Sequence, residues 1–130
     1  MELTEHTAGN HHQIRGIEPS RLFVTDQWYD SSLVVGARYL DTEWPVTSLA
    51  ELDDARINAL VELGPELVIV GVGQRQQILP RECQLGFIRH GIGIECMTLD
   101  AAARTFNVLM SENRRALAAM IISSADSRAD

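Results

Sequence analysis

ELVIVGVGQRQQILP, at residues 66–80, is the stretch that decides the fold. Within it, residues 67–70 form an unbroken run of large aliphatic side chains without polar alternation, which is typical of a strand buried on both faces. Such a strand belongs in the middle of a sheet that is covered on two sides. Gly71 and Gly73 follow it and predict a tight turn, because residues without a Cβ let the backbone bend.

The segment before this strand has the pattern of a crossover helix. Ser48 and Glu51 have capping-box spacing, and apolar residues recur at helical intervals after them. We therefore predict one helix over residues 49–63, ended by Gly64 and delivering the chain into the buried strand. Nearer the N-terminus we predict short strands, at residues 12–17, 21–24, 28–29 and 33–35.

The second half of the chain continues the alternation of helix and strand. A short helix is predicted within residues 80–90, with Leu85 and Ile88 inward, and a strand at 91–97. Thr98 is the predicted N-cap of a helix that extends to Asn113. Its apolar stripe is made of Ala102, Ala103, Phe106, Leu109 and Met110.

Two features near the end of this helix leave alternatives open. Val108 lies among the polar residues, which indicates that this side of the helix is covered. Residues 116–122 are wholly apolar and either continue the helix or form a strand; we predict a final buried strand, because a continuous helix would be too long for the domain. The pattern as a whole predicts an α/β fold in a single domain at residues 11–122, with flexible ends at 1–10 and 123–130.

Composition excludes several classes of protein. The 130 residues carry a formal net charge of −7, which disfavours nucleic acid as a partner. Residues 75–115 nevertheless hold six arginines against four acidic residues, so an anion-tolerant patch there is the alternative to an ordinary solvated surface. All eleven basic residues are arginine, so no lysine is available as a Schiff base, general base or phosphate ligand.

No motif predicts a cofactor or a metal. Gly71-Val72-Gly73 begins like a dinucleotide fingerprint, but Gln76 stands where its third glycine should be, so we expect binding of neither NAD nor ATP. His11 and His12 are adjacent and would point to opposite faces of a strand. The only cysteines, Cys83 and Cys96, lack zinc or redox spacing and are interpreted as apolar fillers.

The strongest candidate cluster lies on the predicted helix after Thr98. Arg104 and Asn107 are neighbours on one face, and Glu112 lies two turns from Arg104. The cluster is either an ion-pair network that holds the helix to the sheet or part of a binding cleft with the loop 71–74. The candidate ligand-binding or partner-binding residues are Gly71, Gly73, Gln74, Arg104, Asn107, Glu112 and Arg114.

Three segments together resemble a widespread family of small proteins whose members include the mitochondrial respiratory complex I assembly factor 3. They are PELVIVGVG at 65–73, GIGIECMT at 91–98, and AARTFNVL at 102–109 with ENR at 112–114. The resemblance implies three layers with a mixed central sheet, no established catalytic activity, and action through protein contacts. This chain departs from the family pattern at Phe106, where tyrosine is more common, and at Asn113, where glycine is.

Two functional hypotheses follow from these observations. The first is a non-enzymatic interaction or assembly module with a protein partner, acting in the cytoplasm as a monomer or weak homo-oligomer. We expect no transmembrane segment, because no apolar run approaches the ~20 residues that span a bilayer. We also expect no targeting leader, because the first 20 residues carry glutamates and histidines where a leader would be apolar or arginine-rich. The alternative is a small-molecule or anion-binding protein, which includes the case of an enzyme of unknown reaction, and which uses the loop 71–74 and Arg104.

Overall fold

The computed structural model describes residues 11–123, so the predicted flexible ends lie outside the described residues except for Ser123. The strands are β1 (Ile14–Glu18), β2 (Arg21–Val24), β3 (Gln27–Tyr29), β4 (Leu33–Val35), β5 (Leu40–Asp41), β6 (Leu67–Val72), β7 (Gly93–Met97) and β8 (Ala116–Ile121). The helices are a 3₁₀ turn, η1 (Leu49–Glu51), and the α-helices α2 (Asp54–Glu62), α3 (Arg81–Ile88) and α4 (Leu99–Ser111).

The central sheet is mixed and has the strand order β5-β4-β8-β6-β7. β6 pairs in parallel with both β7 and β8, whereas β4 pairs antiparallel with β8 and β5. β6 therefore lies inside the sheet, and its residues Val68, Ile69 and Val70 are at most 1% exposed. The prediction of a central strand buried on both faces is confirmed.

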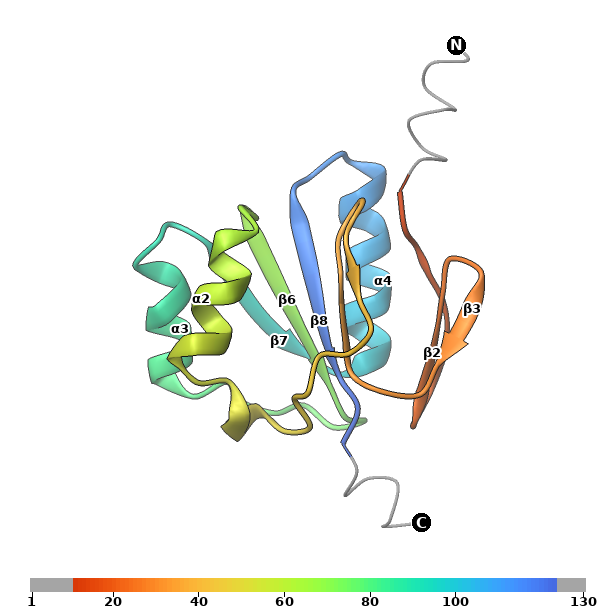
Figure 1. Cartoon of the computed structure of the whole chain (residues 1–130), viewed down its shortest axis with the longest axis horizontal. Helices are drawn as coiled ribbons and strands as arrows, with labels where there is room; N and C mark the ends of the chain where they lie inside the picture. Colours follow the sequence, from red (N-terminus) through yellow and green to blue (C-terminus); the bar gives the residue numbers. More distant parts are fainter. Residues whose placement is uncertain (1–10, 124–130) are drawn as a thin grey trace.

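Helices cover both faces of this sheet, which gives the single α/β domain three layers (Figure 1). Successive side chains of a strand point to opposite faces. Val68 and Val70 accordingly share a core with residues of α2 and α3, whereas Ile69 belongs to a second core with α4. A small antiparallel sheet of order β1-β2-β3 packs beside α4 and closes this second core.

The helix predicted over residues 49–63 is interrupted, and that prediction is wrong at its start. η1 ends at Glu51, and α2 begins only at Asp54, after Asp53 caps it by accepting a hydrogen bond from the Arg56 amide at 3.0 Å. Ser48 makes no side-chain cap. Two capping signals competed here, and the carboxylate of Asp53 is the one that begins the α-helix.

The inward face of α3 also differs from the prediction. Cys83 and Phe87 are buried, whereas Leu85 is half-buried and Ile88 is 55% exposed. Cys83 and Phe87 are four residues apart and lie on one face. Phe87 is the largest apolar side chain of the helix, so burying its face removes more apolar surface from water than burying Ile88 would.

The predictions for α4 and β8 are confirmed, with one exception. The Thr98 hydroxyl accepts a hydrogen bond from the Ala101 amide at 3.3 Å, and residues 116–121 form a buried strand between β4 and β6. The exception is Val108, which is 54% exposed. The polar side of α4 is therefore open to solvent, and its predicted cover is absent.

Candidate functional site

A groove opens where the parallel strands β6 and β8 begin. Its walls are the turn between β4 and β5 and the loop between α4 and β8. It consists of two adjoining hollows of about 310 and 300 Å³, which share Ala37, Arg38 and Arg115. We call it the arginine groove; its lining residues are His11, Gly36, Ala37, Arg38, Tyr39, Leu63, Gly64, Pro65, Met110, Asn113, Arg114, Arg115, Ala116 and Leu117.

The end of α4 places two of the three arginines. Asn113 adopts a left-handed conformation with φ of 59°, and its amide donates to the Met110 carbonyl at 3.0 Å. The Arg114 amide donates to the Leu109 carbonyl at 3.0 Å, which completes a Schellman motif. Arg114 and Arg115 consequently lie just past the helix C-terminus, where the helix dipole favours positive charge.

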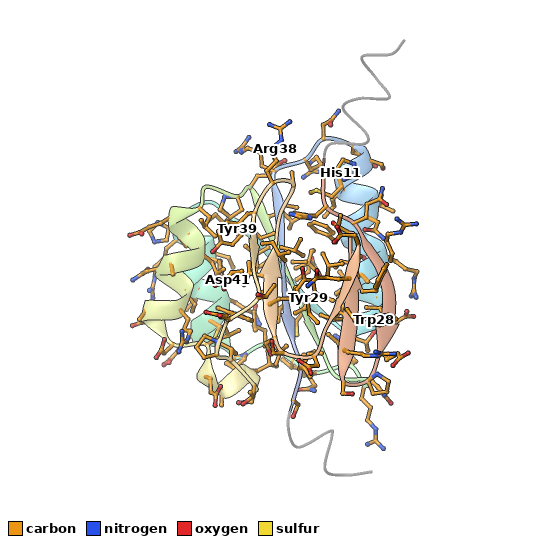
Figure 2. The ribbon with its side chains drawn as sticks, turned by 45° about the vertical axis from the view of Figure 1, so that its right-hand side comes forward. His11, Trp28, Tyr29, Arg38, Tyr39 and Asp41 are labelled. Atoms are coloured by element: carbon orange, nitrogen blue, oxygen red, sulfur yellow. The ribbon has the colours of Figure 1, made fainter. Side chains whose placement is uncertain are left out.

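The turn at residues 36–39 contributes the third arginine. Gly36 donates to the Tyr39 carbonyl at 2.8 Å, and a Cβ at Gly36 would lie 2.9 Å from a Leu117 methyl group, so the turn lies directly on β8. The His12 amide donates to the Ala37 carbonyl at 3.0 Å. This contact brings His11 beside Arg38, as Figure 2 shows.

The groove has more positive charge than its acidic neighbours neutralise. Arg114 Nε donates to Glu66 Oε2 at 2.9 Å, and the Arg115 amide donates to the same oxygen at 3.0 Å. These two bonds, the Arg114 bond foremost, hold the pKa of Glu66 below its ordinary value. The Arg115 guanidinium only donates to the Gly64 carbonyl at 3.4 Å, and within residues 11–123 the Arg38 side chain has no hydrogen-bond or ion-pair partner.

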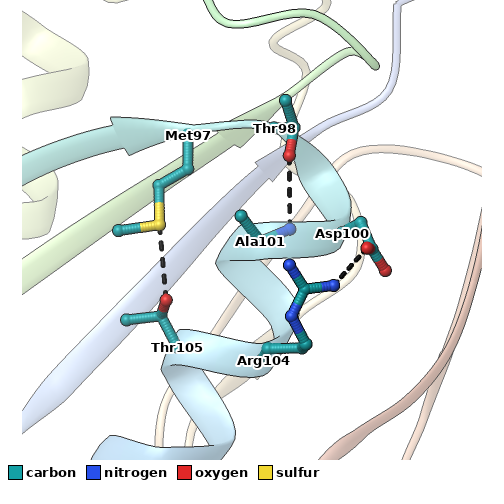
Figure 3. Close-up of polar contacts among 6 residues, drawn as sticks. All are labelled: Met97, Thr98, Asp100, Ala101, Arg104 and Thr105. Carbon is teal, nitrogen blue, oxygen red and sulfur yellow. Dashed lines mark hydrogen bonds and ion pairs between the residues drawn. The ribbon is translucent and has the colours of Figure 1, made fainter.

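A separate hollow, which we call the carboxyl-end cleft, lies at the opposite end of the sheet. It measures about 340 Å³ and is lined by Ile17, Glu18, Pro19, Gly73, Gln74, Thr98, Leu99 and Asp100. The Leu99 amide donates to the Gly73 carbonyl at 3.0 Å, so the loop after β6 is held against the start of α4. Both carboxylates of the cleft are engaged by arginines, Glu18 by Arg21 at 2.8 Å and Asp100 by Arg104 (Figure 3).

The structure distributes the residues of the predicted site between these two ends. Gly73 and Gln74 line the carboxyl-end cleft, and Arg114 lines the arginine groove. Gly71 is buried in β6, where a Cβ would lie 2.7 Å from the Ala102 Cβ, so this glycine serves the close packing of α4. Glu112 is the exposed C-cap residue of α4.

The interpretation of Arg104 as a member of a buried ion-pair network is wrong. Its side chain is 68% exposed and binds Asp100 on its own helix, as drawn in Figure 3. Asp100 lies one turn from Arg104 and is within reach, whereas Glu112 lies two turns away. Asn107 has a structural contact instead. Its side-chain Oδ1 accepts a hydrogen bond from the Ile14 backbone amide at 3.0 Å, and its Nδ2 donates to the Ile14 carbonyl at 2.8 Å.

Arg38 and Arg115 are the two groove arginines that the sequence analysis missed. For Arg115 a signal existed, because two adjacent arginines follow a residue type that tolerates the left-handed conformation at a helix end. For Arg38 the sequence offers none, since its proximity to Arg115 arises only from the pairing of β4 with β8. Elsewhere among the described residues, no three histidine, cysteine, aspartate or glutamate side chains come together as metal ligands.

The family is established by comparison with known sequences. Residues 14–121 match the family described as "Protein of unknown function (DUF498/DUF598)", and the chain belongs to this family. The chain is similar to a Xanthomonas campestris protein solved by NMR, with 37% identity and a TM-score of 0.78 over 85% of this chain and 84% of that one.

Two curated relatives have names that bear on function. The first is "NADH dehydrogenase (ubiquinone) 1 alpha subcomplex assembly factor 3" of Danio rerio, 33% identical over 88 residues, which are 66% of this chain and 51% of the relative. The chain thus spans about half the length of that protein. The second is the "13 kDa major membrane protein" of Francisella tularensis subsp. holarctica (strain LVS), 24% identical over 66% of this chain and 71% of the relative. None of the helices at residues 11–123 has the length and apolar character needed to cross a bilayer.

Proposed function

We propose that this protein is a non-enzymatic interaction or assembly module that holds a protein partner at the arginine groove. The observation that carries the proposal is the convergence of Arg38, Arg114 and Arg115 on one hollow whose described lining includes no carboxylate, with Glu66 paired to Arg114 from outside that lining. The name of the Danio rerio relative supports the same class of function, since an assembly factor acts on other proteins.

The charge of the rest of the chain gives this groove its selectivity. A formal net charge of −7 repels acidic surfaces in general, so an acidic partner is attracted only where positive charge is concentrated. Charged groups at an interface contribute chiefly to orientation and to the rate of association. A stable interface buries about 800 Å² on each partner, so hollows of this size serve as an anchor within a larger contact.

The proposal also includes the cellular location of the protein. We infer a cytoplasmic protein, whose partner can itself be associated with a membrane, as the name of the Francisella tularensis relative suggests for its own setting. Fractionation of cells that express the chain at its native level, with immunodetection in each fraction, checks this inference. Recovery in the membrane fraction after a high-salt wash would contradict it.

The test of the proposed function compares matched charge reversals in affinity capture. Wild type, the double variant Arg38→Glu with Arg115→Glu, and Arg75→Glu are each used to capture proteins from native lysate, followed by mass spectrometry. Arg75 is exposed and lies in the loop after β6, at the opposite end of the sheet. We expect proteins that wild type and Arg75→Glu both retain and that the groove variant loses. Retention of the same proteins by all three folded variants would reject the groove as the docking site.

A second candidate function is small-molecule binding at the carboxyl-end cleft, where Gly73 and Gln74 of the predicted site line the hollow and Arg104 acts only through its partner Asp100. It is favoured by the position of the cleft, because open α/β sheets commonly bind ligands beyond the carboxyl ends of parallel strands. Glu18 and Asp100 in its lining are each paired with an arginine, so the cleft suits an uncharged polar molecule better than a strongly charged one. A ligand screen by NMR, with shift changes confined to Gly73, Gln74 and Leu99, would support this candidate.

A further inference from the structure

We propose that the arginine groove recognises an acidic linear segment in which carboxylates flank one bulky apolar side chain. This inference rests on the proposed function and names the chemistry of the partner. It uses the difference between the two adjoining hollows, one lined by three arginines and the other lined mainly by apolar residues.

Within the arginine groove, the hollow lined by Tyr39, Leu63, Pro65 and Leu117 can hold an apolar side chain, and we call this position the seat. Pro65 and Leu117 are buried there, whereas Tyr39 and Leu63 are 37% and 43% exposed. Large apolar groups that remain exposed at a concave surface gain free energy when a partner covers them. Burial and the charge of Asp41 raise the pKa of Tyr39 above an ordinary value that already lies well above neutral pH, and its protonated hydroxyl can donate a hydrogen bond.

Two of the three arginines lie next to the position of that apolar residue. Arg38 and Arg115 line both hollows, so a carboxylate bound by them lies next to the seat between Tyr39 and Leu63. Arg114 lines only the hollow that has three arginines, and its guanidinium also pairs with Glu66. A guanidinium binds a carboxylate through two parallel hydrogen bonds, and Arg38 has both its edges unused among the described contacts.

Charge favours a short peptide over the other anionic occupants. A nucleic acid or another extended polyanion would bring phosphates over the acidic remainder of the surface, which repels them. A free inorganic anion would use the arginines but leave Tyr39 and Leu63 uncovered. A peptide with a few acidic residues and one apolar residue satisfies both hollows at once.

The experiment measures fluorescence anisotropy of a labelled peptide, Glu-Asp-Leu-Asp-Glu, on full-length protein. The matched probes are Gln-Asn-Leu-Asn-Gln, which lacks the charges, and Glu-Asp-Ala-Asp-Glu, which lacks the bulky side chain. We expect the charged leucine peptide to bind at least ~10-fold more tightly than the amide peptide, because the charge-assisted contacts are absent from the latter. We expect the alanine peptide to bind about 5-fold more weakly, because less apolar surface is covered.

Variants assign the binding to the groove. Arg38→Glu and Arg115→Glu should each weaken binding by about 10-fold or more, whereas Arg75→Glu should remain within about 2-fold of wild type. Leu63→Ala should weaken the leucine peptide and leave the alanine peptide unchanged. Circular dichroism of each variant confirms that it folds.

Three results would overturn the inference. Equal binding of the charged and amide peptides would exclude carboxylate recognition. Full competition by inorganic phosphate, with no effect of Leu63→Ala, would assign the arginines to a small anion. Self-association of wild type in sedimentation, lost in Arg38→Glu and accompanied by no peptide binding, would assign the groove to a second copy of the chain.

Failure of this inference and failure of the proposed function give different results. If groove variants lose their captured proteins but the peptide does not bind, the groove docks a partner of other chemistry. If the peptide binds and the groove variants keep all captured proteins, the chemistry is right and the docking role is wrong.

Discussion

The two ends of the central sheet differ in how their charges are balanced. At the carboxyl-end cleft, Glu18 and Asp100 each have an arginine partner close in sequence. At the arginine groove, the Arg38 side chain has no partner among residues 11–123, the Arg114 guanidinium pairs with Glu66, and the Arg115 guanidinium donates to the Gly64 carbonyl. Ligands of open α/β sheets usually bind beyond the carboxyl ends of the strands, yet the surplus charge of this protein lies at the amino ends.

Helix α4 connects these two ends and explains part of the difference. Its N-terminus lies at the cleft and carries Asp100, and its C-terminus is followed by Arg114 and Arg115. Both placements are favourable for the helix dipole. The surplus arises because a separate turn adds Arg38 to the second end, whereas Arg104 neutralises Asp100 at the first. Positive charge that is favourable at the C-terminus of α4 therefore becomes available to a partner, because the tertiary structure brings a further positive charge beside it.

The largest expected effect comes from loosening α4 itself. Phe106 is fully buried, so Phe106→Ala should cost ~3–5 kcal/mol of a total near 5–15 kcal/mol. Denaturant melts measure the loss, and Val108→Ala at an exposed site is the control. If α4 couples the two ends, hydrogen exchange should quicken at both Leu99 and Arg115. Faster exchange at one end alone would show that the ends are independent.

A smaller effect is expected when only the cleft end is disturbed. Gly71→Ala would place a Cβ 2.7 Å from the Ala102 Cβ and 2.9 Å from Met120 Sδ. Relief of that overlap should cost ~1–3 kcal/mol, with chemical-shift changes near Leu99 and little change at Arg115. The double variant with Ala102→Gly should recover part of the loss because it restores room. Shift changes of equal size at the groove would contradict a local effect.

The matching change at the groove end is at Asn113. A valine there would have to adopt a left-handed conformation, which should cost ~1–2 kcal/mol, whereas Asn113→Gly should be close to neutral. Asn113→Val should also displace Arg114 and Arg115 and weaken binding of the acidic peptide. A valine variant that melts and binds like wild type would mean that the Schellman motif does not position the arginines.

Some parts of the structure could be predicted from the sequence, and others could not. Features with a local physical cause were predictable: the aliphatic run of β6, the Thr98 cap and the apolar stripe of α4. Local signals misled where two of them competed, as with Ser48 and Asp53, or where an apolar residue is simply exposed, as with Val108.

The site was less predictable because its residues meet only through tertiary pairing. Arg114 was identified from its own segment, but Arg38 reaches it through the antiparallel register of β4 on β8. That register depends on burial of both strands and has no signature around residue 38. Arg104 and Asn107 attracted attention as helix neighbours, although one is exposed and the other joins α4 to β1.

Arg104→Gln should have only a small effect on the free energy of unfolding and on peptide binding. It tests whether the cleft end contributes charge to the arginine groove. The Arg104 side chain is 68% exposed, and an exposed ion pair contributes only ~0–1 kcal/mol. Denaturant melts should therefore nearly coincide with those of wild type, and binding of the acidic peptide should be unchanged. A stability loss as large as that of Phe106→Ala, or a tenfold loss of peptide binding, would remove the distinction between the ends.

The smallest expected effect is the protonation of Glu66, which affects the groove alone. Hydrogen bonds from Arg114 and then from the Arg115 amide lower its pKa below the ordinary 4.5. A lowered folded-state pKa means that the charged form stabilises the fold above the unfolded pKa. That contribution is lost as the pH falls through the folded pKa, and protonation then releases Arg114.

An NMR titration checks this at the Arg115 amide, which donates to Glu66 Oε2 at 3.0 Å. Its shift should change with an inflection below pH 4.5. In Glu66→Gln this inflection should be absent, while the thermal midpoint near neutral pH hardly moves, because the bond lies at an exposed site. The Leu99 amide at the cleft end should not follow the same inflection. An inflection at or above pH 4.5 would mean that the arginines do not hold the Glu66 carboxylate in solution, and that the surplus charge of the groove is larger than the structure indicates.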